Sequence, residues 1–416
     1  MNKKDFWSGL LTGILIAAFI VSAVLCGKVI YNATQDAKQS ETASNVGSEE
    51  SAIPEEYESV LEDPELMEKI LLLENAIDEL YIGDVSTEDI KNGIYDGIMS
   101  SLGDPYAAYY TPEEWIELQN STAGIYFGIG AYLQKSMTTL YPQITGIIDD
   151  SPASESELRV DDYIYMVDGE DVYDMDLSEV VSMIKGEEGT TVTLTIVRPS
   201  TGEELDVTLE RRRVESPTVT YEMLEDDILL VTITEFDTVT VDQFAEALAI
   251  GKGSGMQGMI LDLRGNPGGS LAAVVEIARM ILPEGLIVYT EDKYGERVEY
   301  ACDGTHELDV PMVVLVNGGS ASASEILAGA IKDYEMGILV GTTTFGKGIV
   351  QRVVALDDGS AVKLTVSHYY TPLGNDIHEV GISPDVEIEF DSEAYLEDET
   401  DNQLDEAIAI LLDEIG

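Results

Sequence analysis

The sequence is poor in histidine, cysteine and basic residues. Its 416 residues include three histidines, two cysteines and 22 lysines and arginines against 80 aspartates and glutamates, which gives a formal net charge of −58. This charge argues against nucleic acid as a partner, because phosphate binding requires neutralisation by Lys and Arg. It is typical of a surface that keeps a protein soluble in a charged exterior, or of one that repels acidic substrates.

The few cysteines and histidines also argue against bound metal. Cys26 lies within an apolar run and Cys302 stands close to His306, so the sequence contains no disulfide framework. The other two histidines, His368 and His378, are distant in sequence from Cys302 and His306. A Cys/His metal site needs more ligands than these scattered residues supply. We therefore expect no metal ion and no cofactor.

Several common catalytic motifs are missing. The chain contains no GxGxxG opening a βα unit and no GxxxxGK[ST], HExxH or GxSxG, which removes local support for nucleotide, zinc-peptidase and α/β-hydrolase sites. The GNPGG of residues 265–269 resembles the GNSGG box of chymotrypsin-like proteases, but Pro267 occupies the place of that serine. This loop supplies no nucleophile. Gly268 and Gly269 precede a predicted helix, where their N–H groups could stabilise an oxyanion.

The amino end predicts a membrane anchor over residues 6–30. Within it, the uncharged run Phe6–Gly27 has about 22 residues, enough to span ~30 Å of hydrocarbon. Lys3 and Lys4 favour a cytoplasmic location for the short tail, residues 1–5. A cleavable signal peptide is the alternative, but its apolar region would be shorter and followed by an A-x-A-like site. We expect a single-pass cell-membrane protein with its catalytic part outside the cytoplasm.

The residues after the anchor predict a linker and then a helical region. Residues 31–56 are polar and lack apolar periodicity, as flexible linkers do. In the N-terminal helical region, residues 57–118, apolar spacing predicts helices at Leu61–Leu80 and Glu88–Ser101. These helices could pack on the main body or form the arm of a homodimer, and the sequence does not distinguish the two.

Residues 119–212 resemble a PDZ domain. The loop Gly128-Ile129-Gly130 directly precedes an alternating strand. The later features follow in the order expected of a PDZ domain: strand 143–148, the SPAS turn at 151–154, strand 162–168, helix 177–185 and strand 191–197. Such domains capture the terminal carboxylate of a peptide with successive loop N–H groups, while the peptide adds as a strand. The alternative is that the two glycines only make a tight turn.

Residues 213–392 predict an α/β core. Strands at Ile228–Thr234, Gly258–Leu263 and Val310–Asn317 alternate with predicted helices, the first of them at Val241–Ala249, and this pattern indicates a sheet covered by helices. Two β-rich segments follow at Ile349–Ala355 and Ala361–Tyr370. A last helix is predicted at Gln403–Leu412, within residues 393–416. The fold class expected for the whole chain is a multidomain mixture of α/β and β structure.

The strand Val310–Asn317 leads into a serine-rich turn and a helix. Ser322 lies at the helix mouth, where the helix dipole favours negative charge, so it could be a nucleophile. Ser320 and Ser324 are further candidates. Ser322 and Glu325 also match a capping box, in which Ser322 would simply cap the helix.

Lys347 is the candidate base. To accept a proton, a lysine must be neutral, and burial among apolar groups has to lower its pKa from ~10.4 towards 7–8. Phe345 and Ile349 offer such surroundings, and Gln351 lies on the same face of the predicted strand, where its amide oxygen could hold the amine. An exposed lysine at a strand end is the alternative.

Five stretches of the sequence resemble the C-terminal processing peptidases, also called tail-specific proteases. They read LGDPYAAYYTPEEW, RGNPGG, SASASEILAGAIKD, VGTTTFGKGIVQ and YYTPLG…GISPD, and the resemblance covers roughly residues 60–416. It implies a PDZ domain inserted before a ClpP/crotonase-like α/β protease core. It also implies that Ser322 is the nucleophile, Lys347 the general base and Gln351 the residue that orients it. The N–H groups of Gly268 and Ala323 would form the oxyanion hole.

The resemblance implies a Ser–Lys endopeptidase that recognises proteins or peptides with apolar C-termini. Two alternatives remain. A catalytically silent PDZ scaffold on the same fold is disfavoured because nucleophile, base and oxyanion loop are all present. A Ser–His–Asp protease with a PDZ module is disfavoured because it would place that module after the catalytic domain and would need the sequence GNSGG.

Overall fold

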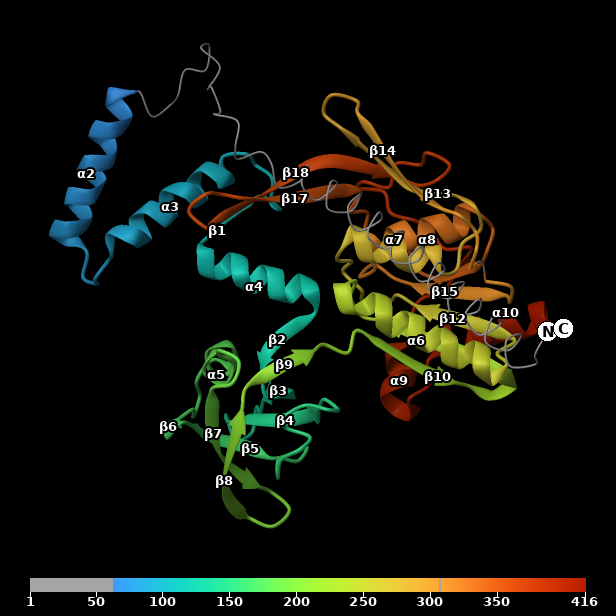
Figure 1. Ribbon diagram of the computed structural model, residues 1–416, viewed down its shortest axis with the longest axis horizontal. Helices are drawn as coiled ribbons and strands as arrows, with labels where there is room; N and C mark the ends of the chain where they lie inside the picture. Colours follow the sequence, from blue (N-terminus) through green and yellow to red (C-terminus); the bar gives the residue numbers. More distant parts are fainter. Residues whose placement is uncertain (1–62, 307) are drawn as a thin grey trace, which may run out of the picture. The chain divides into compact units, whose positions relative to one another are not determined.

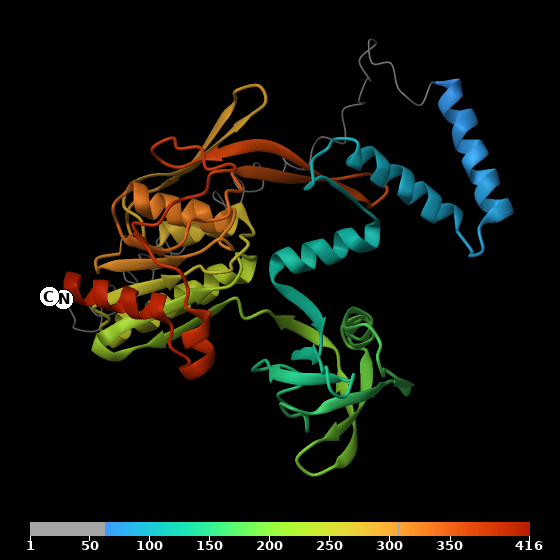
Figure 2. The same ribbon diagram turned by 180° about the vertical axis from the view of Figure 1, so that it is seen from behind.

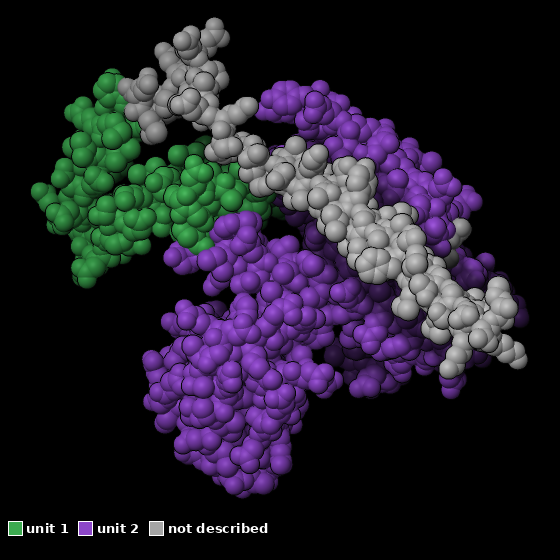
Figure 3. Space-filling view, in the orientation of Figure 1, with its two compact units in different colours: residues 1–112, 353–363 green, residues 113–352, 364–416 purple. Residues whose placement is uncertain are grey.

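A computed structural model describes residues 63–306 and 308–416 (Figure 1). The predicted anchor (6–30) and linker (31–56) lie outside the described residues. Among the helices that are described, none is long and apolar enough to cross a membrane. The chain divides into two compact units, residues 1–112 with 353–363 and residues 113–352 with 364–416 (Figure 3).

The first unit contains the two predicted helices, α2 (Pro64–Leu80) and α3 (Thr87–Ser100). Asp63 caps α2, its side chain accepting the N–H of Glu65 at 2.9 Å. Ser86 and Asp89 form a capping box that starts α3. Neither helix buries a residue. The unit also holds the short strand β1 (Ala108–Tyr110), which pairs with residues 361–363.

The second unit begins with α4 (Pro112–Ala123) and a small β domain at the predicted PDZ position. Its main sheet has the order β3-β4-β5-β7-β8, with β6 on β5, and β2 pairs with β9. The helix α5 (Leu177–Ile184) buries Val180 and Ile184 against Ile144, Ile164 and Leu194 of the sheet. The strands are β2 (Ile125–Gly128), β3 (Ala131–Lys135), β4 (Pro142–Ile147), β5 (Tyr163–Val167), β6 (Glu170–Asp171), β7 (Thr191–Arg198), β8 (Glu203–Glu210) and β9 (Arg212–Glu215).

The β structure of the chain is interrupted at Arg211, between two strands of this domain. β8 ends at Glu210 and β9 starts at Arg212. Arg211 interrupts the pairing because its guanidinium is buried, where it donates to the carbonyl oxygens of Ile184 (2.8 Å) and Met183 (2.9 Å). The break therefore ties the end of β8 to α5.

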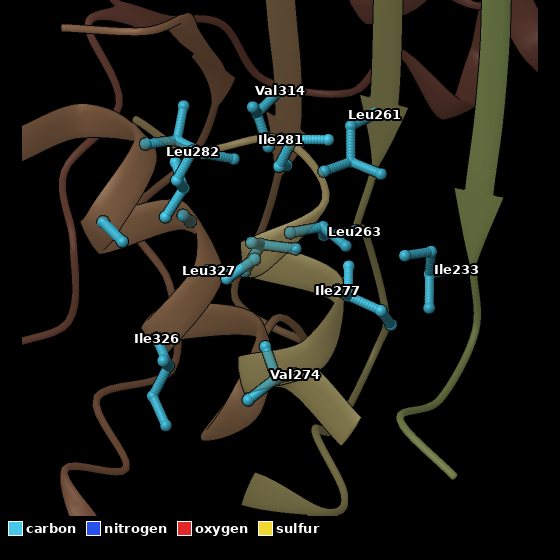
Figure 4. Packing of buried hydrophobic residues seen from close by; sticks show 14 of the residues in the cluster. Ile233, Leu261, Leu263, Val274, Ile277, Ile281, Leu282, Val314, Ile326 and Leu327 are labelled. Carbon is cyan, nitrogen blue, oxygen red and sulfur yellow. The ribbon is translucent and has the colours of Figure 1, made fainter. Parts of the chain in front are cut away.

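The α/β core is a six-stranded sheet of order β10-β11-β12-β15-β16-β19, parallel apart from β10. Helices α6, α7 and α8 bury their apolar faces on one side of it, and α10 covers the other side with Ala407 and Leu411. Figure 4 shows residues of α7 and α8 packed in this core, among them Val274, Ile277, Ile326 and Leu327. Helices α7 and α8 lie side by side in both views (Figure 1; Figure 2). Every residue of β12 and β15 is buried, as expected for parallel strands covered on both faces. The elements are β10 (Val219–Met223), β11 (Ile228–Ile233), α6 (Thr238–Ser254), β12 (Gly258–Asp262), α7 (Leu271–Arg279), β15 (Met312–Val316), α8 (Ala323–Asp333), β16 (Ile338–Gly341), β19 (Val386–Glu387), α9 (Ser392–Asp398) and α10 (Asn402–Ile415).

Four further strands belong, with β1, to a five-stranded antiparallel sheet. The strands β17 (Ile349–Ala355) and β18 (Ala361–Tyr370) have the predicted bounds and pair with each other. The strand β13 (Gly285–Asp292) pairs with β18 and with β14 (Arg297–Cys302), and neither β13 nor β14 was predicted. Lys347 comes two residues before β17, and Tyr369 lies near the end of β18.

Candidate active site

The turn between β15 and α8 carries the three candidate serines in different environments. Ser320 and Ser324 are fully buried, and their hydroxyls donate to the carbonyl oxygens of Leu263 (2.8 Å) and Asn266 (3.0 Å). These two side chains tie the turn to the loop that follows β12. Ser322 is the partly exposed serine of the three. This difference favours Ser322 for any reaction with a ligand.

The backbone of Ser322 is strained. It is the N-cap residue of α8, with φ 54° and ψ −111°, a combination that residues with a side chain rarely adopt. Such strain persists only where surrounding contacts impose it, and it is common at active sites. The capping arrangement predicted for this helix forms, since the N–H of Ser322 donates to Oε2 of Glu325 at 2.8 Å. Capping and a nucleophilic role are therefore compatible at this position.

Gly268 contacts the serine turn directly. Its φ is 105°, and an added Cβ would lie 2.7 Å from the carbonyl oxygen of Ala321, 2.8 Å from Cβ of Ser322 and 2.9 Å from the nitrogen of Ala323. Only glycine permits this approach. In this structure the N–H of Gly268 donates to Oδ1 of Asn266 at 2.8 Å. The predicted oxyanion donors thus flank Ser322, and one of them is already hydrogen-bonded.

Glu325 links the serine turn to the lysine segment. Its side chain is fully buried. Oε2 accepts the N–H groups of Ser322 and Lys347, both at 2.8 Å. Oε1 accepts the N–H of Gly346 at 2.7 Å and the hydroxyl of Thr344 at 2.6 Å. Hydrogen bonds to a charged acceptor are stronger than neutral ones, so this carboxylate holds residues 344–347 against the start of α8.

Tyr369 contacts the same two residues from their carbonyl sides. Its hydroxyl lies 2.6 Å from the carbonyl oxygen of Lys347 and 3.0 Å from that of Ser322. The side chain is 1% exposed. Burial, and secondly the charge of Glu325, raise the pKa of Tyr369 well above its ordinary value near 10, so the hydroxyl remains a donor.

Lys347 and Gln351 lie on a segment that packs closely against residue 378. An added Cβ on Gly348 would lie 2.6 Å from the backbone nitrogen of His378. Lys347 is half-buried, but the side chain of Phe345, which was expected to help shield it from water, is 58% exposed. The amide nitrogen of Gln351 is buried and has no hydrogen-bond partner among the described residues. If Gln351 orients the amine of Lys347, it therefore does so through its amide oxygen.

Comparisons with known proteins agree with this arrangement. Family models match at residues 227–388 (peptidase family S41), 143–198 (PDZ domain) and 23–114 (activating protease CtpB N-terminal domain). A carboxyl-terminal-processing protease of Synechocystis is 36% identical over 70% of this chain and 69% of its own length. The chain belongs to this family of carboxyl-terminal-processing proteases. The family resemblance seen in the sequence is thereby confirmed.

Other relatives of this S41 protease extend the comparison. A CtpA-like serine protease of Staphylococcus saprophyticus is 34% identical over 78% of this chain and 65% of its own length. The chain thus spans about two thirds of the length of these relatives. A Bacteroides fragilis protein assigned to the S41 proteases shares the fold, with a TM-score of 0.50, 17% identity and coverage of 76% of this chain and 90% of that one.

The PDZ domain of this S41 protease places the predicted peptide loop at the edge of its core. The carbonyl oxygens of Ile129 and Gly130 accept the N–H groups of Ala153 (2.7 Å) and Ile148 (3.0 Å). Among the described residues, no acceptor takes the N–H of Ile129 or Gly130. Gly130 has φ 79°, and an added Cβ would lie 2.2 Å from Cβ of Ser151. The loop therefore presents successive N–H groups and requires glycine at 130.

Arg264 connects the RGNPGG loop of this S41 protease to its last helix. It donates to Asp262 (2.7–3.1 Å), to Asp401 (2.8 and 3.0 Å) and to Gln403 (3.0 Å). Burial opposes the charge of the guanidinium, but these hydrogen bonds outweigh it and raise the pKa of Arg264. The start of α10 thus fixes the residue that begins the RGNPGG loop.

Sequence reasoning missed the groups that hold this site together. Glu325 was interpreted only as a helix cap, although its position three residues after Ser322 was noted. Tyr369 carries no local signal, because an aromatic residue in a buried strand ordinarily contributes apolar packing. Asn266 was seen only as part of the glycine loop, whereas its side chain is fully buried and donates to the carbonyl oxygen of Ile233 at 2.8 Å.

Proposed function

We propose that this chain is a serine endopeptidase that uses a Ser322–Lys347 dyad. Ser322 Oγ attacks the scissile carbonyl carbon while the neutral amine of Lys347 takes its proton. The protonated lysine then gives that proton to the leaving amine, and water releases the acyl group from Ser322 by the same route in reverse. Gln351 orients the amine through its amide oxygen.

The observation that carries the proposal is the shared set of partners around Ser322 and Lys347. These residues are far apart in sequence, yet their N–H groups donate to the same oxygen of Glu325. Their carbonyl oxygens both face the hydroxyl of Tyr369. Because the backbones of both residues are held by the same two side chains, the serine and lysine side chains project from neighbouring backbone positions. Acyl transfer needs such preset geometry between nucleophile and base.

The oxyanion would be stabilised by the N–H groups of Gly268 and Ala323. Ala323 is the first residue of α8, where N–H groups have no acceptor within the helix and the dipole favours negative charge. Gly268 lies beside Ala323. The N–H of Gly268 donates to Oδ1 of Asn266, so this hydrogen bond must be shared with the oxyanion or broken before the N–H can stabilise it. We infer that substrate binding changes this hydrogen bond.

The remaining parts of the proposal concern recognition and location. Gly128, Ile129 and Gly130 bind the C-terminal carboxylate of proteins or peptides whose last residues are apolar. Residues 6–30 anchor the protein in the cell membrane with the catalytic domain extracytoplasmic. The helical region 57–118 mediates a homodimer, which the absence of buried residues in α2 and α3 supports. We propose the domain boundaries expected from the sequence, at 119–212, 213–392 and 393–416.

A test of the dyad compares single substitutions at its two members. Ser322→Ala and Lys347→Ala should each abolish cleavage of an unfolded protein with an apolar C-terminus, without loss of thermal stability. Lys347→Arg should also fail, because arginine keeps its charge and accepts no proton. Ser320→Ala serves as a control that removes a hydroxyl committed to Leu263 and should retain turnover in the folded fraction.

Labelling with a fluorophosphonate probe distinguishes the dyad from a silent PDZ scaffold. The wild-type protein should become modified at Ser322, and Lys347→Ala should react far more slowly. Wild-type cleavage by either alanine variant would show that the dyad is wrongly assigned. A wild-type protein that neither cleaves nor labels would favour the scaffold.

A further inference from the structure

The hydroxyl of Tyr369 lies between the backbone carbonyl groups of Ser322 and Lys347, the two residues of the proposed dyad. It has one proton and two carbonyl acceptors, at 2.6 Å from Lys347 and 3.0 Å from Ser322. The ring is part of the main core cluster and is almost fully buried. The hydroxyl is thus the polar tip of a core residue, directed at the catalytic segments.

The two acceptors depend on this hydroxyl to different degrees. The carbonyl oxygen of Ser322 also receives the N–H groups of Glu325 (2.9 Å) and Ile326 (3.0 Å), as the start of α8 requires. The carbonyl of Lys347 lies at the shorter distance from the phenol. Loss of the hydroxyl should therefore act mainly on Lys347 and leave the helix start in place.

Tyr369 complements Glu325. The carboxylate holds the N–H groups of Ser322 and Lys347, and the phenol holds their carbonyl groups. Each of the two residues is thus fixed on both sides of its own Cα, from which its side chain projects. A phenol that remains protonated provides this contact at every pH at which the lysine could work.

We propose that the hydroxyl of Tyr369 is a positioning group that sets the distance between the side chains of Ser322 and Lys347. This inference rests on the proposed dyad. The ring of Tyr369 packs in the core, and its hydroxyl positions the two reacting side chains. A misplacement of about 1 Å between reacting groups can cost on the order of a hundredfold in rate, so the hydroxyl should influence kcat rather than KM.

The test replaces Tyr369 by phenylalanine in the full chain, which removes only the hydroxyl. We expect Tyr369→Phe to lower kcat about tenfold to a hundredfold with KM within about twofold, and to slow fluorophosphonate labelling of Ser322 by a similar factor. The pH profile of labelling should also move, because the lysine would occupy a different environment. Tyr370→Phe is the matched control: it is the next residue of β18 and its ring stacks on Tyr289, at 4.9 Å between centroids. It should behave as wild type.

A second variant guards against a simple packing effect. 4-Fluorophenylalanine at position 369 fills the space of the hydroxyl but offers no proton, so it should lose activity as phenylalanine does. Wild-type kcat and an unchanged labelling profile in either variant would overturn the positioning role while leaving the dyad intact. If wild-type protein does not label at Ser322, the dyad fails and this inference fails with it.

Discussion

At the scale of single residues, the site depends on backbone conformations that few side chains permit. Ser322 has positive φ although it is not glycine, and Gly268 approaches it more closely than any Cβ would allow. Strain of this kind costs on the order of 1–3 kcal/mol and must be offset by surrounding contacts. Glu325 provides them, with four donors on one buried carboxylate.

Gly268→Ala tests the close approach of the RGNPGG loop to Ser322, where the proposed function places an oxyanion donor. The new Cβ would clash with backbone atoms of Ala321 and Ala323, and φ 105° is unfavourable for alanine. We expect activity to fall at least about a hundredfold and the free energy of unfolding to fall by on the order of 2–3 kcal/mol. Turnover assays and thermal melts measure the two effects.

Gly265→Ala is the matched control in the same loop. Its φ of 70° is also left-handed, but no atom lies within 4 Å of the added Cβ. It should lose about 1 kcal/mol of stability and retain most of its activity. Equal activity loss in the two variants would mean that backbone strain alone, and not the contact with Ser322, explains the requirement for glycine at 268.

At the scale of elements, the bounds of β17 and β18 were predicted as the structure has them, and those of β11, β12, β7 and α5 to within one residue, whereas β14 and the full length of α6 were not predicted. The strands β17 and β18 have apolar alternation between turn signals, and the structure reproduces their ranges. The strand β14 was not predicted although Val298, Tyr300 and Cys302 recur at every second position, because the run is short and most of its residues are exposed. It forms because β13 supplies a partner for its backbone and Arg297 packs over Tyr289, 3.5 Å from the ring centroid.

The helix α6 shows why a helix boundary can depend on tertiary packing. Residues 241–249 were predicted, but the helix extends through Gly251 to Ser254. Glycine disfavours helix on its own. Here an added Cβ at 251 would lie 2.6 Å from the side chain of Leu229 and 2.8 Å from that of Met256, so the close packing of the helix on β11 favours glycine at this position. Local propensity could not reveal that contact.

The likeness to C-terminal processing peptidases pointed to the site residues, whereas the contacts that join them needed the fold. Local chemistry did not distinguish among the three candidate nucleophiles. Burial does, because Ser320 and Ser324 are fully buried whereas Ser322 is partly exposed. The contacts from Glu325 and Tyr369 to Lys347 join segments at least 22 residues apart. Spacing along the chain carries no information on such contacts.

The start of α6 gives a pH-dependent prediction. Burial, and secondly the charge of Glu235, raise the pKa of Asp237 to about 7. A raised pKa means that the folded state holds a proton that the unfolded chain has lost above pH ~4. The stability contributed by this proton is complete below pH ~4 and is lost as the pH rises to about 7. The ionised carboxylate is therefore a cost at neutral pH.

Asp237→Asn should remove that cost while keeping a good capping residue. We expect the variant to be more stable than wild type by on the order of 2–4 kcal/mol at pH 8, with the advantage shrinking to about zero near pH 4. Melting temperatures between pH 4 and 8.5 measure it. Asp242→Asn, at an exposed position of the same helix, should show little difference. A constant advantage across this pH range would contradict the assignment.

At the scale of the whole molecule, the proposed function assigns recognition and chemistry to separate sheets. The loop Gly128–Gly130 belongs to the PDZ domain, and Ser322 belongs to the α/β core. Under this proposal, cleavage of a substrate selected by its C-terminus depends on two contacts. The loop would recognise the carboxylate, and the scissile bond would bind near Ser322. The two contacts can therefore be tested by separate changes.

Amidating the substrate's C-terminus should weaken recognition without affecting the dyad. The amide loses the negative charge that the N–H groups of Ile129 and Gly130 would bind, so we expect KM to rise about tenfold, equivalent to about 1.4 kcal/mol. Labelling of Ser322 by a fluorophosphonate in the absence of substrate should not change.

Gly130→Ala, whose Cβ would overlap Ser151, should bind free and amidated substrates equally poorly. Gly169→Ala is the control, since its φ of 85° is also left-handed but no atom lies within 4 Å of the added Cβ. If the free acid and the amide were cleaved with the same KM by wild-type protein, the loop would not be the carboxylate site.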